Sequence, residues 1–213
     1  MSGKVLVVDY GIGNVFSVCN AIRRIGGDVE LTGDLKAIRE ADRVILPGVG
    51  AFARAMDALR AKGIVSALQD FIATGRPFMG VCIGMQVLME RSTEFGENEG
   101  LGFLRGEVVR IPGQGPDGSH LRVPHIGWAG LEPKEQGWDG TPLAGIRPKE
   151  DFVYFVHSYH CVPSDPSRIL ATVDYGGVPV TAAIRQENII GVQFHPERSG
   201  EVGQQILQAF LDQ

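Results

Sequence analysis

Three side chains that can carry out nucleophilic chemistry stand at positions 82, 195 and 197 of this chain. Cys82 lies within the run GVCIGMQ at 80–86, and His195 and Glu197 lie within the run GVQFHPE at 191–197. A thiolate attacks carbonyl carbon, an imidazole moves the proton, and a carboxylate holds the imidazole in one tautomer. The three residue types together predict covalent catalysis through Cys82.

The residues around Cys82 predict a sharp turn from a strand into a helix. Residues 77–81 form an apolar run typical of a buried strand, and residues 83–91 have a helical pattern. Gly80 and Gly84 suit a chain that doubles back, because a Cβ there would meet neighbouring backbone. The start of a helix beside Cys82 favours the thiolate and offers free N–H groups to an oxyanion. A lone cysteine is usually a core residue, but these glycines and the second motif favour catalysis.

The second motif brings an imidazole and a carboxylate to the end of another strand. Pro196 fixes its own φ and biases His195 toward extended conformations, so the side chains at 195 and 197 emerge on the same side. We expect Glu197 to hold the Nδ1–H of His195 and the Nε2 atom to face Cys82. Without the cysteine turn, the His-Pro-Glu run would be interpreted as an ordinary surface turn.

The first half of the chain alternates strands with helices. Apolar runs typical of strands occur at 5–8, 43–46 and 77–81, and helical spacing occurs at 15–25, 52–59 and 64–72. This alternation predicts right-handed crossovers and a doubly wound α/β fold with a mostly parallel central sheet. Functional residues gather at the carboxyl ends of such strands. Cys82 and the glycine-containing runs at 11–14 and 47–50 are all expected at that edge.

The second half predicts a smaller antiparallel sheet. Strand patterns occur at 106–111, 151–157, 169–173, 180–185 and 189–194, with few helices between them, and residues 201–211 form an amphipathic helix. A chain of 213 residues with 44% hydrophobic residues can bury one sizeable core. We therefore expect one domain that spans residues 1–213.

Composition and charge exclude several classes of function. The net charge is −5 and the basic residues are scattered, so we expect no nucleic-acid partner. No apolar stretch approaches the ~20 residues that cross a bilayer, and the N-terminus leads directly into a strand. We expect a cytoplasmic protein without a membrane partner. Three cysteines without CxxC spacing argue against a disulfide framework and a structural zinc site.

Neither a nucleotide nor a metal cofactor is expected. The run GIGN at 11–14 is half of a dinucleotide-binding fingerprint, but the third glycine is missing and no acidic residue clearly ends a second strand. The histidines outside the second motif do not have the spacing of metal ligands; they are His120, His125, His157 and His160. We interpret them as structural or interface residues.

The cysteine turn and the downstream His-x-Glu resemble those of the class I glutamine amidotransferases, and the resemblance covers nearly the whole chain. The resemblance implies a flavodoxin-like fold and hydrolysis of the glutamine side-chain amide through a thioester. Cys82 would be the nucleophile, His195 the acid and base, and Glu197 the group that fixes the tautomer. An N–H of Ile83 and one from the turn formed by Gly48, Val49 and Gly50 would meet the oxyanion.

The same resemblance implies where glutamine binds. Gln86 and Glu94 would hold its amino-acid end, helped by backbone at His157, Ser158 and Tyr159. Each has an alternative interpretation, because Gln86 fits an exposed helix face and Glu94 fits the acidic loop at 94–99. The turn at 47–50 also has two interpretations. It is either a switch that forms its oxyanion donor when a partner binds, or a plain turn between strand and helix.

Three further runs narrow the resemblance within the family. DYGIGN at 9–14, VPHIGW at 123–128 and YFVHSY at 154–159 resemble the glutaminase subunits of imidazole glycerol phosphate synthases in histidine biosynthesis. This implies a heterodimer with a separate cyclase subunit that receives ammonia, and an interface that includes Tyr10, Asn14, Trp128 and Tyr154. Those subunits usually have Asn after the Gly-Trp pair, whereas this chain has Ala129.

Other functions remain open from the sequence. One is the glutaminase part of another amidotransferase, such as those of anthranilate, aminodeoxychorismate or pyridoxal phosphate synthesis. Others are a stand-alone γ-glutamyl hydrolase, a cysteine peptidase of similar fold, and an inactive domain that only regulates a partner. The inactive domain is the least favoured, because Cys82, His195 and Glu197 are all present.

Overall fold

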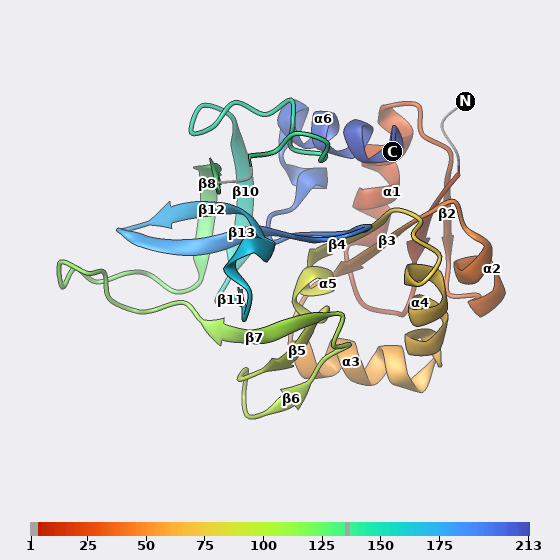
Figure 1. Ribbon diagram of the computed structural model, residues 1–213, viewed down its shortest axis with the longest axis horizontal. Helices are drawn as coiled ribbons and strands as arrows, with labels where there is room; N and C mark the ends of the chain where they lie inside the picture. The colour runs from red at the N-terminus through yellow and green to blue at the C-terminus, as the bar shows by residue number, and fades with distance from the viewer. Residues whose placement is uncertain (1–3, 135–136) are drawn as a thin grey trace.

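An eight-stranded sheet forms the centre of the computed structural model, which describes residues 4–134 and 137–213 (Figure 1). The strand order is β2-β1-β3-β4-β14-β13-β12-β9, and the strands from β2 to β14 are parallel. Their bounds are β1 Val5–Val8, β2 Val29–Thr32, β3 Arg43–Gly48, β4 Phe78–Cys82 and β14 Ile189–Val192. This is the flavodoxin-like order, so the predicted doubly wound fold is confirmed.

Helices cover both faces of this sheet. In Figure 1, α1 and α6 lie on one side of the sheet, and α3 and α4 lie on the other. The helices are α1 Val15–Arg24, α2 Leu35–Glu40, α3 Phe52–Ala61, α4 Ile64–Ile72, α5 Ile83–Gln86 and α6 Gly200–Leu211. The helix α4 buries Ile64, Ala67, Leu68 and Phe71, a spacing that turns one stripe toward the sheet.

The chain after α5 extends the main sheet and, among the described residues, adds two smaller sheets. The hairpin of β12 Ile169–Tyr175 and β13 Val178–Gln186 continues the main sheet, with β9 Glu132–Pro133 at its edge. An antiparallel pair joins β8 His125–Gly130 to β10 Phe152–His157. A mixed sheet contains β11 Tyr159–Pro163, β7 Leu104–Arg110, β5 Met89–Ser92 and β6 Asn98–Glu99. The predicted antiparallel region is therefore present, but its strands at 169–185 and 189–194 belong to the central sheet, where β14 is parallel to β4.

The helix predicted at 83–91 is wrong in length. The helix α5 ends at Gln86, and the chain turns into β5 from Met89 onward. The N–H of Leu101 donates to the carbonyl of Val87 over 2.7 Å, and the N–H of Leu104 donates to the carbonyl of Leu88. Long-range pairing with the small sheet thus replaces the hydrogen bonds that would have continued the helix.

One continuous cluster of buried apolar side chains draws on both halves of the chain. Phe52 and Phe78 come from the first half, and Phe155, Phe194 and Phe210 come from the second. Two short 3₁₀ turns, Pro166–Arg168 and Pro196–Arg198, complete the described elements. In the part of the chain that the structure describes, no helix is long and apolar enough to cross a membrane.

The carboxyl ends of β3, β4 and β14 meet at one edge of the sheet. Gly48 is in register with Cys82, and Val192 is in register with Val81. The turn after β3, the cysteine and the segment that leads to His195 are therefore neighbours. This edge is the place where a doubly wound sheet binds its ligands.

Candidate active site

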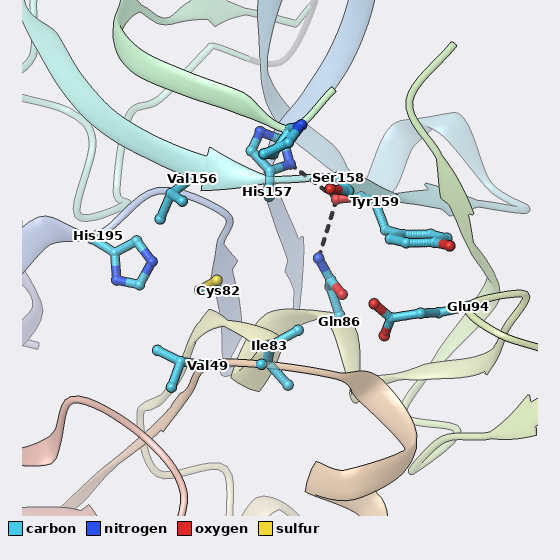
Figure 2. Close-up of a pocket in the computed structure, with 12 residues that line it drawn as sticks. Val49, Cys82, Ile83, Gln86, Glu94, Val156, His157, Ser158, Tyr159 and His195 are labelled. Carbon is cyan, nitrogen blue, oxygen red and sulfur yellow. Dashed lines mark hydrogen bonds between the residues drawn. The ribbon is translucent and has the colours of Figure 1, made fainter. Parts of the chain in front are cut away.

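A cavity of about 290 Å³ opens at this edge, and Figure 2 shows the side chains around it. Its volume lies near the lower end of the range for small-molecule pockets. Its walls are Val49, Gly50, Cys82, Ile83, Gln86, Glu94, Pro124, Val156, His157, Ser158, Tyr159 and His195. The structure therefore brings together most of the residues that the sequence singled out.

Cys82 occupies a strained backbone conformation at the strand-to-helix turn. Its φ is 55° and its ψ is −112°, a region that residues other than glycine rarely adopt. A Cβ on Gly84 would lie 1.8 Å from the carbonyl oxygen of Leu46, and one on Gly80 would lie 2.5 Å from the carbonyl oxygen of Gly84. The expectation that both glycines permit a close approach of backbone is confirmed.

His195 is fixed through its ring and through its backbone. Its Nδ1 lies 2.8 Å from Oε1 of Glu197, whose side chain is 1% exposed. The backbone N–H of His195 donates to the carbonyl of Tyr154, and the hydroxyl of Ser199 donates to the carbonyl of His195 over 2.7 Å. Among the described residues, Nε2 of His195 has no hydrogen-bond partner.

His195 carries a positive charge at neutral pH. Burial by itself disfavours the charged imidazolium, but the neighbouring Cys82 and Glu197 outweigh it and raise the pKa of His195 to about 10. Figure 2 shows the imidazole and the sulfur on the same side of the cavity. The pair is therefore suited to hold an imidazolium beside a thiolate.

Gln86 and Glu94 both turn into the cavity. Gln86 is 2% exposed, and its Nε2 donates to the carbonyl of Tyr159 over 3.1 Å and to Oε1 of Gln193 over 2.9 Å. Glu94 is 9% exposed, and its Oε2 accepts from the N–H of Phe52 at the start of α3. The alternatives of an exposed helix face for Gln86 and of a solvated acidic loop for Glu94 are thus wrong.

The cavity wall opposite α5 includes His157, which belongs to a group of buried, uncharged histidines. Nδ1 of His157 donates to the carbonyl of Tyr159 over 2.9 Å, so its Nε2 accepts from Nδ1 of His125 at 3.1 Å. Burial lowers the pKa of His157 to about 3, and burial lowers the pKa of His125 to about 4. Burial likewise lowers the pKa of His160 to about 4. The interpretation of these histidines as structural residues fits their burial.

The turn after β3 contributes two of its three candidate residues to the cavity. Val49 and Gly50 line it, and Gly50 has a φ of 90°. Gly48 lies behind them, where a Cβ would be 2.7 Å from the hydroxyl oxygen of Tyr10. That hydroxyl donates to the carbonyl of Pro47 over 2.9 Å. The hydroxyl of Tyr10 thus fixes the backbone of the turn at Pro47.

The four residues predicted at a partner interface divide into exposed and buried positions. Trp128 is 54% exposed and meets the ring of Tyr154 edge-on, with 5.9 Å between the ring centroids. Asn14 is exposed. Tyr10 is only 1% exposed, so the prediction that its side chain forms part of an interface is wrong. Its hydroxyl is already bonded within the fold, and burial raises its pKa.

Comparison with known proteins identifies the family. A model of the family described as glutamine amidotransferase class-I matches residues 6–213. The chain belongs to the class I glutamine amidotransferases. Imidazole glycerol phosphate synthase subunit HisH 1 of Legionella pneumophila (strain Lens) is 45% identical over 98% of this chain and 98% of its own length. Subunit HisH of Lactococcus lactis subsp. lactis (strain IL1403) is 41% identical over 99% and 98%.

Two solved structures share the fold. PurLQS from Thermotoga maritima matches with a TM-score of 0.75 and 21% identity, covering 100% of this chain and 99% of that one. A second structure, described as a glutamine amidotransferase, matches with a TM-score of 0.73 and 20% identity over 98% and 97%. These likenesses support the doubly wound architecture alone.

Three residues of this amidotransferase site were not singled out from the sequence. Pro124 and Val156 line the cavity, and Gln193 lies behind the sulfur. Gln193 is a polar residue at the end of an apolar strand and is 0% exposed, which is a signal that the sequence does contain. Pro124 and Val156 have no such signal, because their position depends on the pairing of β8 with β10.

Proposed function

We propose that this protein is the glutaminase subunit of an imidazole glycerol phosphate synthase. It hydrolyses glutamine to glutamate and ammonia and passes the ammonia to a cyclase subunit in histidine biosynthesis. One observation carries the chemical part of the proposal: Cys82 and His195 share a cavity with Gln86 and Glu94. The full-length likeness to subunits named HisH supports the choice of synthase.

The end of the cavity at Gln86 and Glu94 presents oxygen atoms that can bind a cation. Both N–H groups of Gln86 are taken by Tyr159 and Gln193, so only its Oε1 is left for a ligand. Glu94 adds a carboxylate beside it, and Figure 2 shows the two at the end of the cavity away from His195. The α-ammonium of glutamine fits this end, and its side-chain amide then extends toward Cys82.

The first half of the reaction breaks the amide. The thiolate of Cys82 attacks the carboxamide carbon, and the carbonyl electrons move onto oxygen, where the N–H groups of Ile83 and of the turn at Val49 and Gly50 are proposed to meet them. His195 then gives its proton to the leaving nitrogen. The C–N bond breaks, ammonia departs, and a γ-glutamyl thioester and a neutral imidazole are left.

The second half restores the enzyme. The neutral imidazole of His195 takes a proton from water, and the oxygen attacks the thioester carbon. Collapse of this intermediate breaks the C–S bond, releases glutamate and returns Cys82 as the thiolate beside an imidazolium. Glu197 keeps Nδ1 protonated through both halves, which leaves Nε2 as the atom that moves protons.

An exposed apolar face beside the cavity supports the proposed cyclase partner. Ile126 and Trp128 on β8 and Phe152 on β10 are 59%, 54% and 48% exposed. They stand on one face of the β8–β10 pair with Tyr154, and Val156 carries this face to the cavity wall. Contiguous apolar patches of this kind mark interaction sites. Cover by a partner would also keep ammonia from being protonated in bulk water.

The proposed partner face is connected to the proposed acid and base. The carbonyl of Tyr154 accepts from the N–H of His195. The N–H of Tyr154 donates to the hydroxyl of Ser199, and that hydroxyl donates in turn to the carbonyl of His195. We propose that Asn14 and Trp128 contact the cyclase together with Tyr154. Tyr10 acts indirectly, through the turn at 47–50.

The test is reconstitution with a separately purified cyclase subunit of imidazole glycerol phosphate synthase. Cys82→Ala should abolish glutamine-dependent synthesis, whereas synthesis from added ammonium should continue in the complex. Cys19→Ala, at a buried cysteine of α1, is the matched control and should keep both activities. If glutamine-dependent synthesis survives in Cys82→Ala, Cys82 is not the nucleophile.

The same complex tests the turn at 47–50. If the turn is a switch, the glutaminase rate should rise when the cyclase binds its own substrate. Equal rates with and without that substrate would favour the plain turn. Glutaminase activity without any association with the cyclase would contradict the choice of synthase and favour another amidotransferase or a stand-alone hydrolase.

A further inference from the structure

A fully buried amide contacts the sulfur from behind. Gln193 follows β14 and is 0% exposed, and its backbone N–H donates to the carbonyl of Ala182 over 2.8 Å. Its Nε2 donates to Sγ of Cys82 at 3.7 Å, and its Oε1 accepts from Nε2 of Gln86 at 2.9 Å. One side chain therefore joins the sulfur to a residue at the opposite end of the cavity.

The orientation of this amide is set by a backbone carbonyl. The carbonyl of Tyr159 can only accept, and it takes one N–H from Gln86 and another from His157. The nitrogen of Gln86 must therefore face Tyr159, and its second N–H points to Gln193. Gln193 must present its oxygen to that N–H, so its own N–H groups face the sulfur. A reversed amide would leave two donors facing each other.

The N–H donor of Gln193 can stabilise a thiolate at Cys82, which the short turn after Cys82 does only weakly. The predicted helix after Cys82 would have stabilised a thiolate through its dipole, but α5 spans only Ile83–Gln86. Cys82 is 5% exposed, so a charge on its sulfur has little water to solvate it. A hydrogen bond to the charged form of a buried group favours that form.

We propose that Gln193 is a positioning residue with two tasks. Its N–H stabilises the thiolate of Cys82, and its carbonyl oxygen locks the amide of Gln86 so that Oε1 of Gln86 faces the cavity. The second task rests on the proposed glutaminase function, because it concerns glutamine binding. The first task concerns the sulfur alone and holds for any reaction of Cys82.

Two substitutions separate the tasks. Gln193→Glu keeps an oxygen that accepts from Gln86 but replaces the N–H donor to the sulfur by a carboxyl oxygen. Gln193→Met fills a similar volume and removes both interactions. Gln186→Met is the matched control, because it removes the side-chain amide of another glutamine, whose Nε2 donates to the carbonyl of Phe103 over 2.9 Å on a strand away from the sulfur.

The first measurement is the rate at which iodoacetamide alkylates Cys82 across a range of pH, with Cys82→Ala as the background. In both Gln193 variants, the pH of half-maximal rate should move upward by about one unit, which is about a tenfold loss of thiolate at a given pH below the midpoint. Gln186→Met should keep the wild-type profile. A wild-type profile in a folded Gln193 variant would overturn the proposal.

The second measurement is the split between kcat and KM for glutamine in the complex with the cyclase. Gln193→Glu should lower kcat and keep KM within about threefold, whereas Gln193→Met should lower kcat and raise KM about tenfold. Equal KM values in the two variants would contradict the role of Gln193 in fixing Gln86. Alkylation needs no turnover, so the two proposals can fail separately. If the Gln193 variants shift the alkylation profile but the wild-type complex has no glutaminase activity, the proposed function is refuted and the contact of Gln193 with the sulfur stands.

Discussion

Two histidines line the same cavity and have opposite charge states. His195 is 4% exposed and His157 is 6% exposed. The pKa of His195 is raised to about 10, whereas the pKa of His157 is lowered to about 3. Burial acts on both rings in the same direction, toward the neutral form. The difference must therefore come from what each ring contacts.

The contacts account for the difference. His195 has an anionic partner in Glu197 at Nδ1 and Cys82 on its other side. His157 has a backbone carbonyl at Nδ1 and another imidazole, that of His125, at Nε2. A neutral carbonyl does not compensate for the desolvation of a cation, and a second imidazole adds no anion. The wall with His195 is thus suited to proton transfer, and the wall with His157 is suited to a fixed, uncharged shape.

Removal of the carboxylate should have the largest effect. Glu197→Gln keeps an acceptor for Nδ1 of His195 but removes the negative charge, so the pKa of His195 should fall below about 10, and only Cys82 is left to raise it against burial. We expect kcat/KM for glutamine to fall about 10³-fold at neutral pH. The alkaline limit of the pH–rate profile should also move to lower pH.

The exposed Glu201 on α6 provides the control for that experiment. Glu201→Gln makes the same chemical change close by in the sequence and should leave the pH–rate profile as it is. An alkaline limit that stays near pH 10 in Glu197→Gln would show that Glu197 does not set the charge of His195.

The uncharged histidines should make the fold sensitive to acid. His125, His157 and His160 have pKa values of about 4, 3 and 4 in the folded protein, below the ordinary 6.5 of an unfolded chain. Between these values the unfolded state binds more protons, so the free energy of unfolding falls as pH falls from about 6.5 to about 4. Each histidine contributes at most about 1.4 kcal/mol per pH unit. Urea denaturation at pH 7 and pH 5 measures this loss.

Single substitutions show which histidines cause the loss of stability at acid pH. His160→Gln should reduce the loss of stability between pH 7 and pH 5, whereas the exposed His120→Gln should leave it unchanged. His195 has the opposite sign, because its contribution is complete below pH 6.5 and is lost as pH rises through about 10. Equal stability of the wild-type protein at pH 7 and pH 5 would contradict the neutral state of this wall.

The substitution with the smallest expected effect tests whether the backbone contacts that position His195 also set its charge. Ser199→Ala removes a hydroxyl that joins the carbonyl of His195 to the N–H of Tyr154. The free energy of unfolding should fall by about 1–2 kcal/mol, because a buried carbonyl and a partly buried N–H lose their partner. The alkaline limit of the pH–rate profile should stay in place, since Glu197 remains. A limit displaced as far as in Glu197→Gln would mean that the backbone contacts also set the charge.

The sequence was a good guide wherever a pattern is local. The alternation of strands and helices predicted the doubly wound sheet, and the glycines on either side of Cys82 predicted the sharp turn. It was a poor guide where distant pairing competes with local preference. The helix predicted at 83–91 stops at Gln86, because the following residues pair with β6 and β7 instead. Tyr10 was misplaced for a related reason, since only the packed turn buries it against Pro47.

The sequence by itself determined the fold class and the chemical groups, because strand and helix periods and the glycines of a tight turn are encoded in neighbouring residues. The tertiary structure decided which of those groups are charged and how their side chains are oriented. The charge of His195 depends on Cys82 and Glu197, the neutrality of His157 depends on its burial without an anionic partner, and the contact of Gln193 with Cys82 depends on β14 beside β4. Burial and electrostatic partners are properties of the folded chain, and they come from segments that lie far apart in the sequence.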